Sequence, residues 1–478
     1  MIVDADVIFH AMIVRRAKIL ATMGPALEVP GILEKVMLAG ADAFRINFSH
    51  GNDEQHAHYL NLIRTTSAKL KKPCAVLADL MGPKVRIDAK TYHLALNEKV
   101  DVIPRPGDPN SKVKAIGISF SGLAKLVKPD QRILLDDGKL EIIVTGTTGN
   151  KVHCRVVRGG VLTPNKSLNV PGIDLGLPVL STKDKSDLRF IQKAGFDWIA
   201  ASFIRDGKDI RSIKKFMASL DFTLPIVAKV ESAQAVDNLR EIVTEAEGVM
   251  VARGDLGVEL DLERIPTVQR DIIHLARELG KLTIVATQML ETMTTSSRPT
   301  RAEVTDVSTA ALARVDVLML SGETAAGQYP VETVQMMDKT IRMTEKNLET
   351  EIVSISHPET IALVCEAGQY LSLISSATVM VAISTHGNTP RILSTFRGNI
   401  PVVVACTQPA IYNRSSLYYS VVPIMIKPLT NPEKIFWQVA EDLKSKGLVV
   451  KGNIIIFMFG HPIHAPKGTN SIRRWEVD

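Results

Sequence analysis

Short apolar runs that end abruptly in charged or hydroxyl residues recur along this chain. Two of them lie near its middle: residues 226–231 read Ile-Val-Ala-Lys-Val-Glu, and residues 249–257 read Val-Met-Val-Ala-Arg-Gly-Asp-Leu-Gly. A parallel strand that is buried on both faces has such a continuous apolar run. Because side chains alternate along a strand, Lys229 and Glu231 should point the same way. The pattern predicts parallel strands with polar residues at their carboxyl ends.

The same pattern repeats often enough to predict a closed barrel. Amphipathic helical segments separate eight apolar runs, at residues 17–22, 43–47, 74–79, 198–201, 226–230, 249–252, 283–286 and 317–320. Eight parallel strands alternating with helices are typical of a (β/α)8 (TIM) barrel, which keeps its chemistry at the carboxyl ends of the strands. A doubly wound open sheet is the alternative, but polar residues at nearly every strand end favour the ring.

The alternation of strands and helices is interrupted once and changes again before the C-terminus. Asp136-Asp137-Gly138, between two short alternating strands, is a hairpin signal. We expect an all-β, barrel-like lid inserted into the barrel, followed by a smaller open α/β domain. The predicted domains are residues 1–83 and 179–346 (barrel), 84–178 (lid) and 347–478 (C-terminal domain). We also expect a loose lead-in at residues 1–14 and a turn at residues 106–110.

Composition narrows the class of protein without changing this picture. The chain has 478 residues, 45% of them hydrophobic and 23% charged, which is usual for a soluble protein of several domains. Its net charge of +6 suits an enzyme that acts on anionic metabolites. The basic residues are too dispersed, and the aromatic residues too few, to favour nucleic-acid binding. No apolar run approaches the ~20 residues of a membrane span.

The cysteines and the first residues favour a cytoplasmic protein. The four cysteines are far apart and lack the spacing of a metal site: Cys74, Cys154, Cys365 and Cys406. We therefore expect buried thiols in a reducing compartment. Asp4 and Asp6 stand where a secretory signal would have a basic segment, so a signal peptide is not predicted.

Polar residues at the predicted strand ends can bind a metal ion and an anion together. Glu231 and Asp255 supply two carboxylates, which suit Mg²⁺ or Mn²⁺ when substrate oxygens complete the coordination. Lys229 would lie beside them, and Gly254 lets the backbone approach a ligand closely. Each has a structural alternative. Lys229 and Glu231 could form an ion pair at the barrel rim, and Asp255 could cap a helix.

Four motifs, in this order, resemble those of the pyruvate kinase family. They are Arg-Ile-Asn-Phe-Ser-His-Gly at residues 45–51, Ala-Arg-Gly-Asp-Leu-Gly at 252–257, Ala-Thr-Gln-Met-Leu-Glu at 286–291 and Leu-Ser-Gly-Glu-Thr-Ala at 320–325. The resemblance runs from about residue 18 to residue 345, includes the inserted domain, and is weaker in the C-terminal third. It implies the final step of glycolysis, in which the phosphoryl group of phosphoenolpyruvate passes to ADP and gives pyruvate and ATP.

The resemblance implies roles for residues on several strands. The catalytic residues would be Lys229, Arg45, Thr287 and Ser321. The substrate would contact Arg45, Lys229, Gly254, Asp255 and Thr287, and the divalent ion would bind Glu231 and Asp255. Lysine and arginine would neutralise charge on the moving phosphoryl group, and the two hydroxyl groups would relay a proton to the enolate carbon. Asn47, Arg86 and Lys166 would meet the nucleotide. Purely structural roles remain open for Ser321 and for Arg45, which could pair with Asp79.

One departure from the family concerns its monovalent cation. Members that require K⁺ hold it with Asn, Ser and Asp side chains and a Thr carbonyl, and the corresponding residues here are Asn47, Ser49, Asp79 and Leu80. Those members also have Glu where this chain has Lys84. A lysine ammonium is itself a monovalent cation, so we expect that K⁺ is not required, as in the largely bacterial and archaeal K⁺-independent branch. A solvated lysine at the lid hinge is the alternative.

The C-terminal domain contains a candidate effector site. A predicted loop between a strand and a helix is rich in hydroxyl groups and contains a glycine, a composition that can hold a phosphate: Ser384, Thr385, His386, Gly387, Asn388 and Thr389. The resemblance implies allosteric control by a sugar phosphate or a nucleotide, and a homotetramer. An ordinary turn between strand and helix is the alternative.

Two other functions remain open. The first is another (β/α)8 enzyme that acts on phosphoenolpyruvate or pyruvate with Mg²⁺, such as an aldolase or a mutase, which would not need the inserted lid. The second is a non-catalytic binding protein that keeps the fold and turns over no substrate.

Overall fold

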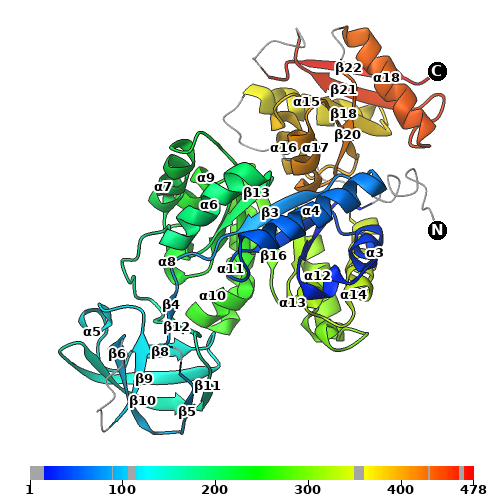
Figure 1. Ribbon diagram of the computed structural model, residues 1–478. Helices are drawn as coiled ribbons and strands as arrows, with labels where there is room; N and C mark the ends of the chain where they lie inside the picture. Colours follow the sequence, from blue (N-terminus) through cyan, green and yellow to red (C-terminus); the bar gives the residue numbers. More distant parts are fainter. Residues whose placement is uncertain (1–14, 89, 106–112, 349–359, 429–430, 462–467) are drawn as a thin grey trace.

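The structure is a computed structural model that describes residues 15–88, 90–105, 113–348, 360–428, 431–461 and 468–478. The lead-in predicted at residues 1–14 and the turn predicted at residues 106–110 lie outside these ranges. The lid and the C-terminal domain lie at opposite ends of a central barrel (Figure 1). The predicted boundaries after residues 83, 178 and 346 fall in connections between elements.

Eight parallel strands close into a barrel, so the predicted (β/α)8 architecture is confirmed and the doubly wound alternative is wrong. Their order around the ring is β1-β17-β16-β15-β14-β13-β3-β2. They are β1 (Lys18–Thr22), β2 (Ala43–Asn47), β3 (Ala75–Asp79), β13 (Trp198–Ala201), β14 (Ile226–Val230), β15 (Gly248–Ala252), β16 (Leu282–Ala286) and β17 (Val317–Leu320). Alternation along β1 illustrates the burial on both faces: Ile19 packs in the outer core under the helices, and Leu20 packs in the barrel interior.

Helices with clear end signals connect these strands. The long helices are α3 (Ile32–Ala39), α4 (Asp53–Leu70), α6 (Thr182–Ala194), α7 (Gly207–Ala218), α11 (Ile265–Glu278), α12 (Arg301–Leu312) and α14 (Pro330–Lys346). Short ones are α2 (Pro25–Glu28), α8 (Ala233–Asp237), α9 (Leu239–Glu245), α10 (Arg253–Glu259) and α13 (Gly322–Ala325). The side chain of Asn52 caps α4, and Ser181 with Asp184 forms a capping box on α6. Gly40 ends α3 with a φ of +128°, as expected for a glycine stop.

The inserted residues form the lid around a separate apolar core. A seven-stranded sheet has the order β4-β12-β8-β9-β10-β6-β7, and β11 pairs with β5. Bounds are β4 (Val85–Arg86), β5 (Tyr92–Leu94), β6 (Lys99–Pro104), β7 (Lys114–Ile118), α5 (Leu123–Leu126), β8 (Arg132–Leu135), β9 (Leu140–Thr148), β10 (Lys151–Arg158), β11 (Gly160–Leu162) and β12 (Ser167–Asn169). The predicted hairpin is confirmed, because β8 and β9 are antiparallel and Asp136, Asp137 and Gly138 all have positive φ.

The C-terminal domain is an open five-stranded sheet with the order β20-β19-β18-β21-β22. Its elements are α15 (Thr360–Ile374), β18 (Val379–Ile383), α16 (Asn388–Thr395), β19 (Val402–Cys406), α17 (Pro409–Arg414), β20 (Val421–Met425), α18 (Pro432–Ser445), β21 (Ile454–Phe459) and β22 (Ser471–Glu476). This open sheet with helices agrees with the smaller open α/β domain that the sequence predicts. The sequence does not predict the antiparallel edge strand β22, whose charged residues conceal a strand pattern.

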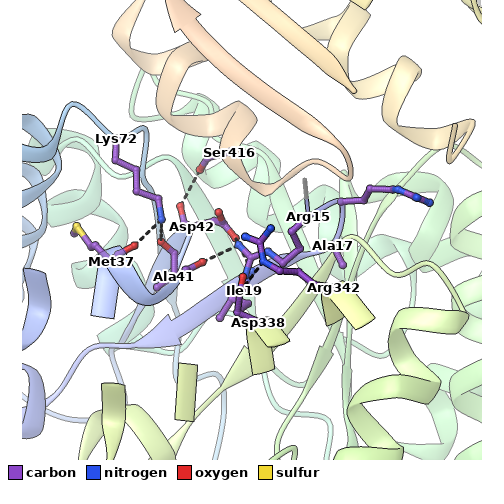
Figure 2. A network of polar contacts seen from close by, with 12 residues as sticks. Arg15, Ala17, Ile19, Met37, Ala41, Asp42, Lys72, Asp338, Arg342 and Ser416 are labelled. Carbon is purple, nitrogen blue, oxygen red and sulfur yellow. Dashed lines mark hydrogen bonds and ion pairs between the residues drawn. The ribbon is translucent and has the colours of Figure 1, made fainter. Parts of the chain in front are cut away.

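The C-terminal domain closes the amino-terminal end of the barrel. Trp198 of the barrel and Tyr418 of the C-terminal domain belong to one apolar cluster, with their ring centroids 5.9 Å apart. Asp316, which precedes β17, forms a buried bidentate pair with Arg397. The hydroxyl of Ser416 donates to the carbonyl of Asp42 at 3.2 Å (Figure 2). Access to the barrel is therefore left at the carboxyl ends of its strands, beside the lid.

Two further predictions concern the burial of the cysteines and the presence of membrane-spanning segments. All four cysteines are buried, as predicted. Burial raises the pKa of Cys74 and of Cys154 to about 12, so these thiols stay protonated at neutral pH. Within the described ranges, no helix combines the length and the apolar character that a membrane crossing needs.

Candidate active site

Charged side chains from neighbouring strands meet at the carboxyl end of the barrel. Lys229 lies near the end of β14, and its Nζ is 2.7 Å from Oε1 of Glu231. The same ammonium lies 3.5 Å from Oδ1 of Asp79 and donates to the hydroxyl of Ser202 at 2.8 Å. The prediction that Lys229 and Glu231 point the same way is confirmed. The two do form the ion pair of the structural alternative, and that pair opens onto the barrel mouth.

Arg45, on β2, joins the group through Asp79. Its Nε is 2.6 Å from Oδ2 of Asp79, and its Nη1 donates to the hydroxyl of Thr22 at 3.3 Å. The structural pairing of Arg45 with Asp79 is therefore present. It does not bury the guanidinium completely, because 13% of the Arg45 side chain remains exposed. The carboxylate of Asp79 thus contacts both Lys229 and Arg45 and orients them toward the open end of the barrel.

The pKa shifts show that carboxylates dominate this site. Burial alone would lower the pKa of Lys229, but Asp79, Glu231 and Asp255 outweigh burial and raise it. Burial would raise the pKa of Asp79, yet Lys229 and Arg45 lower it. For Glu231, burial raises the pKa and Asp255 adds to the effect, against the attraction of Lys229. Three carboxylates beside two cations leave room for a further positive charge.

Glu231 and Asp255 fit a divalent cation. Asp255 lies in the first turn of α10, whose N-cap is Ala252, so the alternative that Asp255 caps this helix is wrong. Glu231 accepts a hydrogen bond from the Phe203 amide at 2.7 Å through its second oxygen, which fixes the carboxylate. The described residues contain no cluster of three or more His, Cys, Asp or Glu side chains suited to a metal. Two carboxylates are what Mg²⁺ usually takes when substrate supplies other oxygens.

Thr287 and Gly254 meet where β15 and β16 end side by side. The amide of Gly254 donates to the hydroxyl of Thr287 at 2.8 Å, and that hydroxyl donates to the Ala286 carbonyl at 2.6 Å. Gly254 lies in the first turn of the short helix α10. Thr287 has a φ of +68°, which is rare for a β-branched residue.

Ser321 follows β17 and has an unusual hydroxyl. Its Oγ is buried and has no hydrogen-bond partner among the described residues. Its amide donates to Glu323 at 2.7 Å, and the other oxygen of Glu323 accepts from the Leu290 amide at 3.2 Å. The orphaned hydroxyl therefore has bonding capacity left for a molecule in the barrel mouth.

Two of the three residues predicted to meet a nucleotide, Lys166 and Arg86, are engaged within the lid and its hinge, and Asn47 is engaged at the end of β2. Lys166 is 2.8 Å from Oδ1 of Asp136, and Arg86 donates to the carbonyl of Asn165 at 2.8 Å. The side-chain oxygen of Asn47 accepts from the Ser49 amide at 3.1 Å. None of these three predicted residues has a described contact with Lys229, so the structure does not bring them into the group of charged side chains around Lys229.

Lys84 lies on the Glu231 side of the rim, which is the carboxyl-terminal end of the barrel around Lys229. Its ammonium is 5.1 Å from the centroid of the Phe203 ring, and its charge acts to lower the pKa of Glu231. The carbonyl of Leu80 accepts from the hydroxyl of Ser202 at 2.8 Å. Three of the four positions that correspond to a monovalent-cation site, Asn47, Asp79 and Leu80, are thus already engaged in protein hydrogen bonds.

Sequence reasoning missed four residues that shape the rim: Thr22, Ser202, Phe203 and Arg253. Ser202 and Thr22 could have been found, because each hydroxyl lies at or directly after the end of an apolar run. Phe203 and Arg253 act through contacts that no local pattern shows. Phe203 offers its amide, and Arg253 binds carbonyls of another loop.

The predicted effector loop lines a cavity of about 290 Å³ in the C-terminal domain. Gly387 has a φ of +82°, and its amide donates to the hydroxyl of Ser384 at 3.0 Å. Thr389 lies in the first turn of α16 and shares a 2.6 Å hydrogen bond with Thr469, which also lines the cavity. The cavity is lined by Ile361, Ile383, Ser384, Thr385, His386, Asn388, Thr389, Phe459, Gly460, Gly468 and Thr469.

Comparisons with known proteins agree over almost the whole chain. Residues 14–334 match the family model described as the pyruvate kinase barrel domain, and residues 362–473 match the pyruvate kinase alpha/beta domain. The chain is 35% identical to pyruvate kinase 2 of Synechocystis sp., over 97% of this chain and 79% of that protein. It is 35% identical to a pyruvate kinase of Corynebacterium glutamicum, over 96% and 97% of the two chains. The crystal structure of a pyruvate kinase from Cryptosporidium parvum superposes with a TM-score of 0.90 at 26% identity, covering 98% of this chain and 97% of that one.

Proposed function

Because this chain belongs to the pyruvate kinase family, we propose that the rim residues transfer the phosphoryl group of phosphoenolpyruvate to ADP. One observation carries the proposal: the ammonium of Lys229 lies within 3.5 Å of carboxylates from two different strands, at the open end of the barrel. Phosphoryl transfer depends mainly on positioning and charge neutralisation. The rim supplies both.

Each charged residue has a separate role in the transfer. Arg45 offers a planar fork of donors to the substrate phosphate. Lys229 neutralises charge on the moving group and on the enolate oxygen that remains. Glu231 and Asp255 would hold Mg²⁺ or Mn²⁺, which when bound supplies further positive charge at the phosphoryl oxygens. The amides at Gly254 and Asp255 would face the substrate carboxylate.

Two hydroxyl groups would then carry a proton to the enolate carbon. Thr287 is held against the Gly254 amide, and Ser321 has a buried hydroxyl with unused bonding capacity. A relay needs such a group within hydrogen-bond reach of the reacting atoms. We assign the proton step to this pair.

The lid would supply the nucleotide contacts on closing. Arg86 and Lys166 are basic side chains at its hinge and edge, and Asn47 is the last residue of β2 in the barrel. Lys166 pairs with Asp136 in this structure, so binding a nucleotide phosphate requires it to exchange that carboxylate for the phosphate. No comparable lid would be needed by an aldolase or a mutase.

Lys84 would replace the monovalent cation. It acts on Glu231 electrostatically, and Asn47 and Leu80 already use their oxygens within the protein. We expect turnover in tetramethylammonium chloride and in KCl to agree within about twofold, since both salts screen charge equally. The variant Lys84→Glu should become activated by K⁺. Strong activation of the wild type by K⁺ would contradict this role.

The C-terminal cavity would bind a phosphorylated effector, a sugar phosphate or a nucleotide. A physical connection to the rim supports allosteric control. The cavity lies at the start of α16, Arg397 follows the end of that helix, and its partner Asp316 precedes β17. At the other end of β17 stands Ser321. A shift of α16 on ligand binding would thus act on a rim residue.

We also propose a homotetramer in the cytoplasm. Three large apolar side chains are exposed on one face of α15, at Leu363 (66%), Tyr370 (58%) and Ile374 (66%). The edge strand β22 has β21 on one side and no described strand on the other. Both features suit contact with another copy of this chain. The glycolytic reaction supports the cytoplasmic location.

A coupled assay tests the proposed reaction. With phosphoenolpyruvate, ADP and Mg²⁺, pyruvate formation is followed through NADH oxidation by lactate dehydrogenase. The wild type should turn over, and Lys229→Met should lose about 10³-fold or more in kcat while remaining folded, because the charge acts on the transition state. Absence of pyruvate formation would favour another barrel enzyme or a binding protein. Unchanged turnover in Lys229→Met would remove Lys229 from the mechanism.

A further inference from the structure

Two consecutive residues after β16 have a left-handed backbone. Thr287 has a φ of +68° and Gln288 a φ of +54°. A β-branched residue rarely adopts this conformation, so neighbouring groups must hold it. The conformation sets the direction of the Thr287 hydroxyl, which accepts from the Gly254 amide at 2.8 Å. A change in this turn would therefore move the hydroxyl.

Arg253 holds the turn through its main-chain carbonyls. Its Nε donates to Ala286 at 3.3 Å and to Thr287 at 3.2 Å. Its Nη2 donates to Thr287 at 2.5 Å and to Gln288 at 3.1 Å. Its Nη1 lies 2.6 Å from Oδ2 of Asp306 on α12, and only 11% of the side chain is exposed. The guanidinium is thus anchored on one side and binds three successive carbonyls with the other.

We propose that Arg253 is a positioning residue for Thr287, holding the left-handed turn so that the hydroxyl faces the reacting carbon. The inference rests on the proposed function, in which Thr287 relays the proton. A planar guanidinium with five donors can bind several carbonyls at fixed angles, and a lysine cannot. Without Arg253 the carbonyls lose their donors and the turn is free to return to negative φ.

The simpler alternative is that Arg253 only ties α10 to α12. A measurement confined to the proton step separates the two roles. In D₂O with pyruvate, Mg²⁺ and ATP, the enzyme should exchange the methyl protons of pyruvate. A methyl C–H bond breaks and its proton passes through the Thr287 relay to solvent. The C–H electron pair forms the C2–C3 double bond, and the carbonyl π pair moves to the enolate oxygen. C3 then takes a deuteron back through the relay as the carbonyl re-forms. Loss of the methyl signal in proton NMR gives the rate.

Arg253→Met should lower the methyl exchange and kcat together by about 10- to 100-fold, the effect of misplacing a reacting group. The KM for phosphoenolpyruvate should stay within about threefold, because the charged groups that bind the substrate, Arg45 and Lys229, keep their places. Asp306→Asn should give a smaller loss of the same kind. Thr287→Val, measured in parallel, tests the relay itself.

Arg64→Met is the matched control. Arg64 also binds a carboxylate, Asp197 at 2.6 Å, and two carbonyls, Cys74 at 2.7 Å and Gly195 at 2.9 Å. These contacts lie at the amino ends of β3 and β13, away from the rim. The control should lower stability in urea and leave the methyl exchange per folded molecule unchanged.

A second substitution tests the backbone argument directly. Glycine adopts positive φ without steric cost, so Gln288→Gly should let the turn keep its conformation without the clamp. Adding Gln288→Gly to Arg253→Met should restore at least about threefold of the lost exchange. A tie between α10 and α12 would not be restored by this change.

The outcomes distinguish this inference from the proposed function. Exchange within about threefold of wild type in folded Arg253→Met, or a rise in KM alone, overturns the positioning role. If Thr287→Val loses exchange in that case, the relay stands. If Thr287→Val keeps exchange, the relay fails and this inference with it. If Arg253→Met does not fold, the rate of methyl exchange in Asp306→Asn replaces it as the test. A lower rate supports the positioning role, and an unchanged rate overturns the inference.

Discussion

Two buried charge clusters occupy opposite ends of the same barrel and differ in their ratio of carboxylates to cations. The rim cluster has three carboxylates and two cations: Asp79, Glu231, Asp255, Lys229 and Arg45. The base cluster has three cations and three carboxylates: Arg15, Lys18 and Lys72 with Asp42, Asp338 and Glu345. Both consist of the same residue types, so the type of residue alone does not distinguish a reactive site from a structural one.

The buried lysines report this difference through opposite pKa shifts. Burial lowers the pKa of Lys18 to about 8, because Arg15 and Lys72 oppose the attraction of Asp42 and Glu345. At the rim, burial also acts to lower the pKa of Lys229, but the three carboxylates reverse the effect and raise it. The rim therefore keeps a charged ammonium and has surplus negative charge for a metal ion. The base has no such surplus.

The two clusters also differ in what their cations bind. At the base, Arg15 donates to the carbonyl of Gly40 at 2.7 Å. Lys72 donates to the carbonyls of Met37 and Ala41, each at 2.7 Å (Figure 2). At the rim, Lys229 binds side chains only. Carbonyls bind the base cations to a folded loop, whereas the rim contacts can rearrange when a ligand arrives.

The sharpest test of the comparison removes one carboxylate from the rim. Glu231→Gln should lower kcat by about 10³-fold, equal to roughly 4 kcal/mol, because it removes a metal ligand and a partner of Lys229. The free energy of unfolding should change little, since Lys229 keeps Asp79 and the repulsion from Asp255 is relieved. The coupled assay with a Mg²⁺ titration, and urea unfolding, check both parts. Turnover within about tenfold of wild type would contradict the assignment of Glu231.

The corresponding change at the base should have the opposite result. Asp42→Asn should lower the free energy of unfolding by about 3 kcal/mol, because buried cations lose their shared carboxylate. The pKa of Asp42 is lowered in the folded state, since the neighbouring cations outweigh burial. Its contribution is therefore present above the unfolded pKa and is lost as pH falls through the folded one. Urea unfolding at pH 7 and at about pH 3, below the ordinary aspartate pKa, should show a smaller deficit at the lower pH.

The turnover of Asp42→Asn provides the control. Per folded molecule it should equal that of the wild type, because the cluster lies at the far end of the strands from Lys229. A large loss of kcat with little loss of stability would show that the base cluster takes part in the reaction, and the division between the two ends would fail.

The rim could be predicted from the sequence because its signals are local. A strand that ends in charge places Lys229 and Glu231 on one side, and the same rule finds Thr287 and Ser321 after their strands. The closed ring follows from counting such runs. The alternation of the lid strands and the Asp-Asp-Gly turn likewise depend on neighbours in the sequence.

The base cluster could not be predicted in this way, because its burial depends on segments far apart. Asp42 and Lys72 stand in short polar connections that read as solvated, and they become buried only when Arg15 and the C-terminal domain cover them. Arg253 was missed for a related reason. Its partners are carbonyls of a left-handed turn, and Thr287 has no side-chain signal for positive φ.

The smallest effect concerns pH and separates the two lysines directly. In the folded state Lys18 has a pKa of about 8, below its ordinary value of 10.5. Between those values the unfolded chain binds more protons than the folded one, so the free energy of unfolding rises with pH. The Lys18 contribution between pH 7.5 and pH 9 should be about 1 kcal/mol. Urea unfolding across this range should show the rise in wild type and a shallower one in Lys18→Met.

Lys229→Met is the control for that slope, and the sign of its shift explains why. A raised pKa contributes stability that is present below the unfolded value and lost only as pH rises through the folded one. Between pH 7.5 and pH 9 both states of Lys229 are protonated, so the variant should keep the wild-type slope. If Lys229→Met flattened the slope and Lys18→Met did not, the rim would lack its excess of carboxylates and the contrast between the two ends would be reversed.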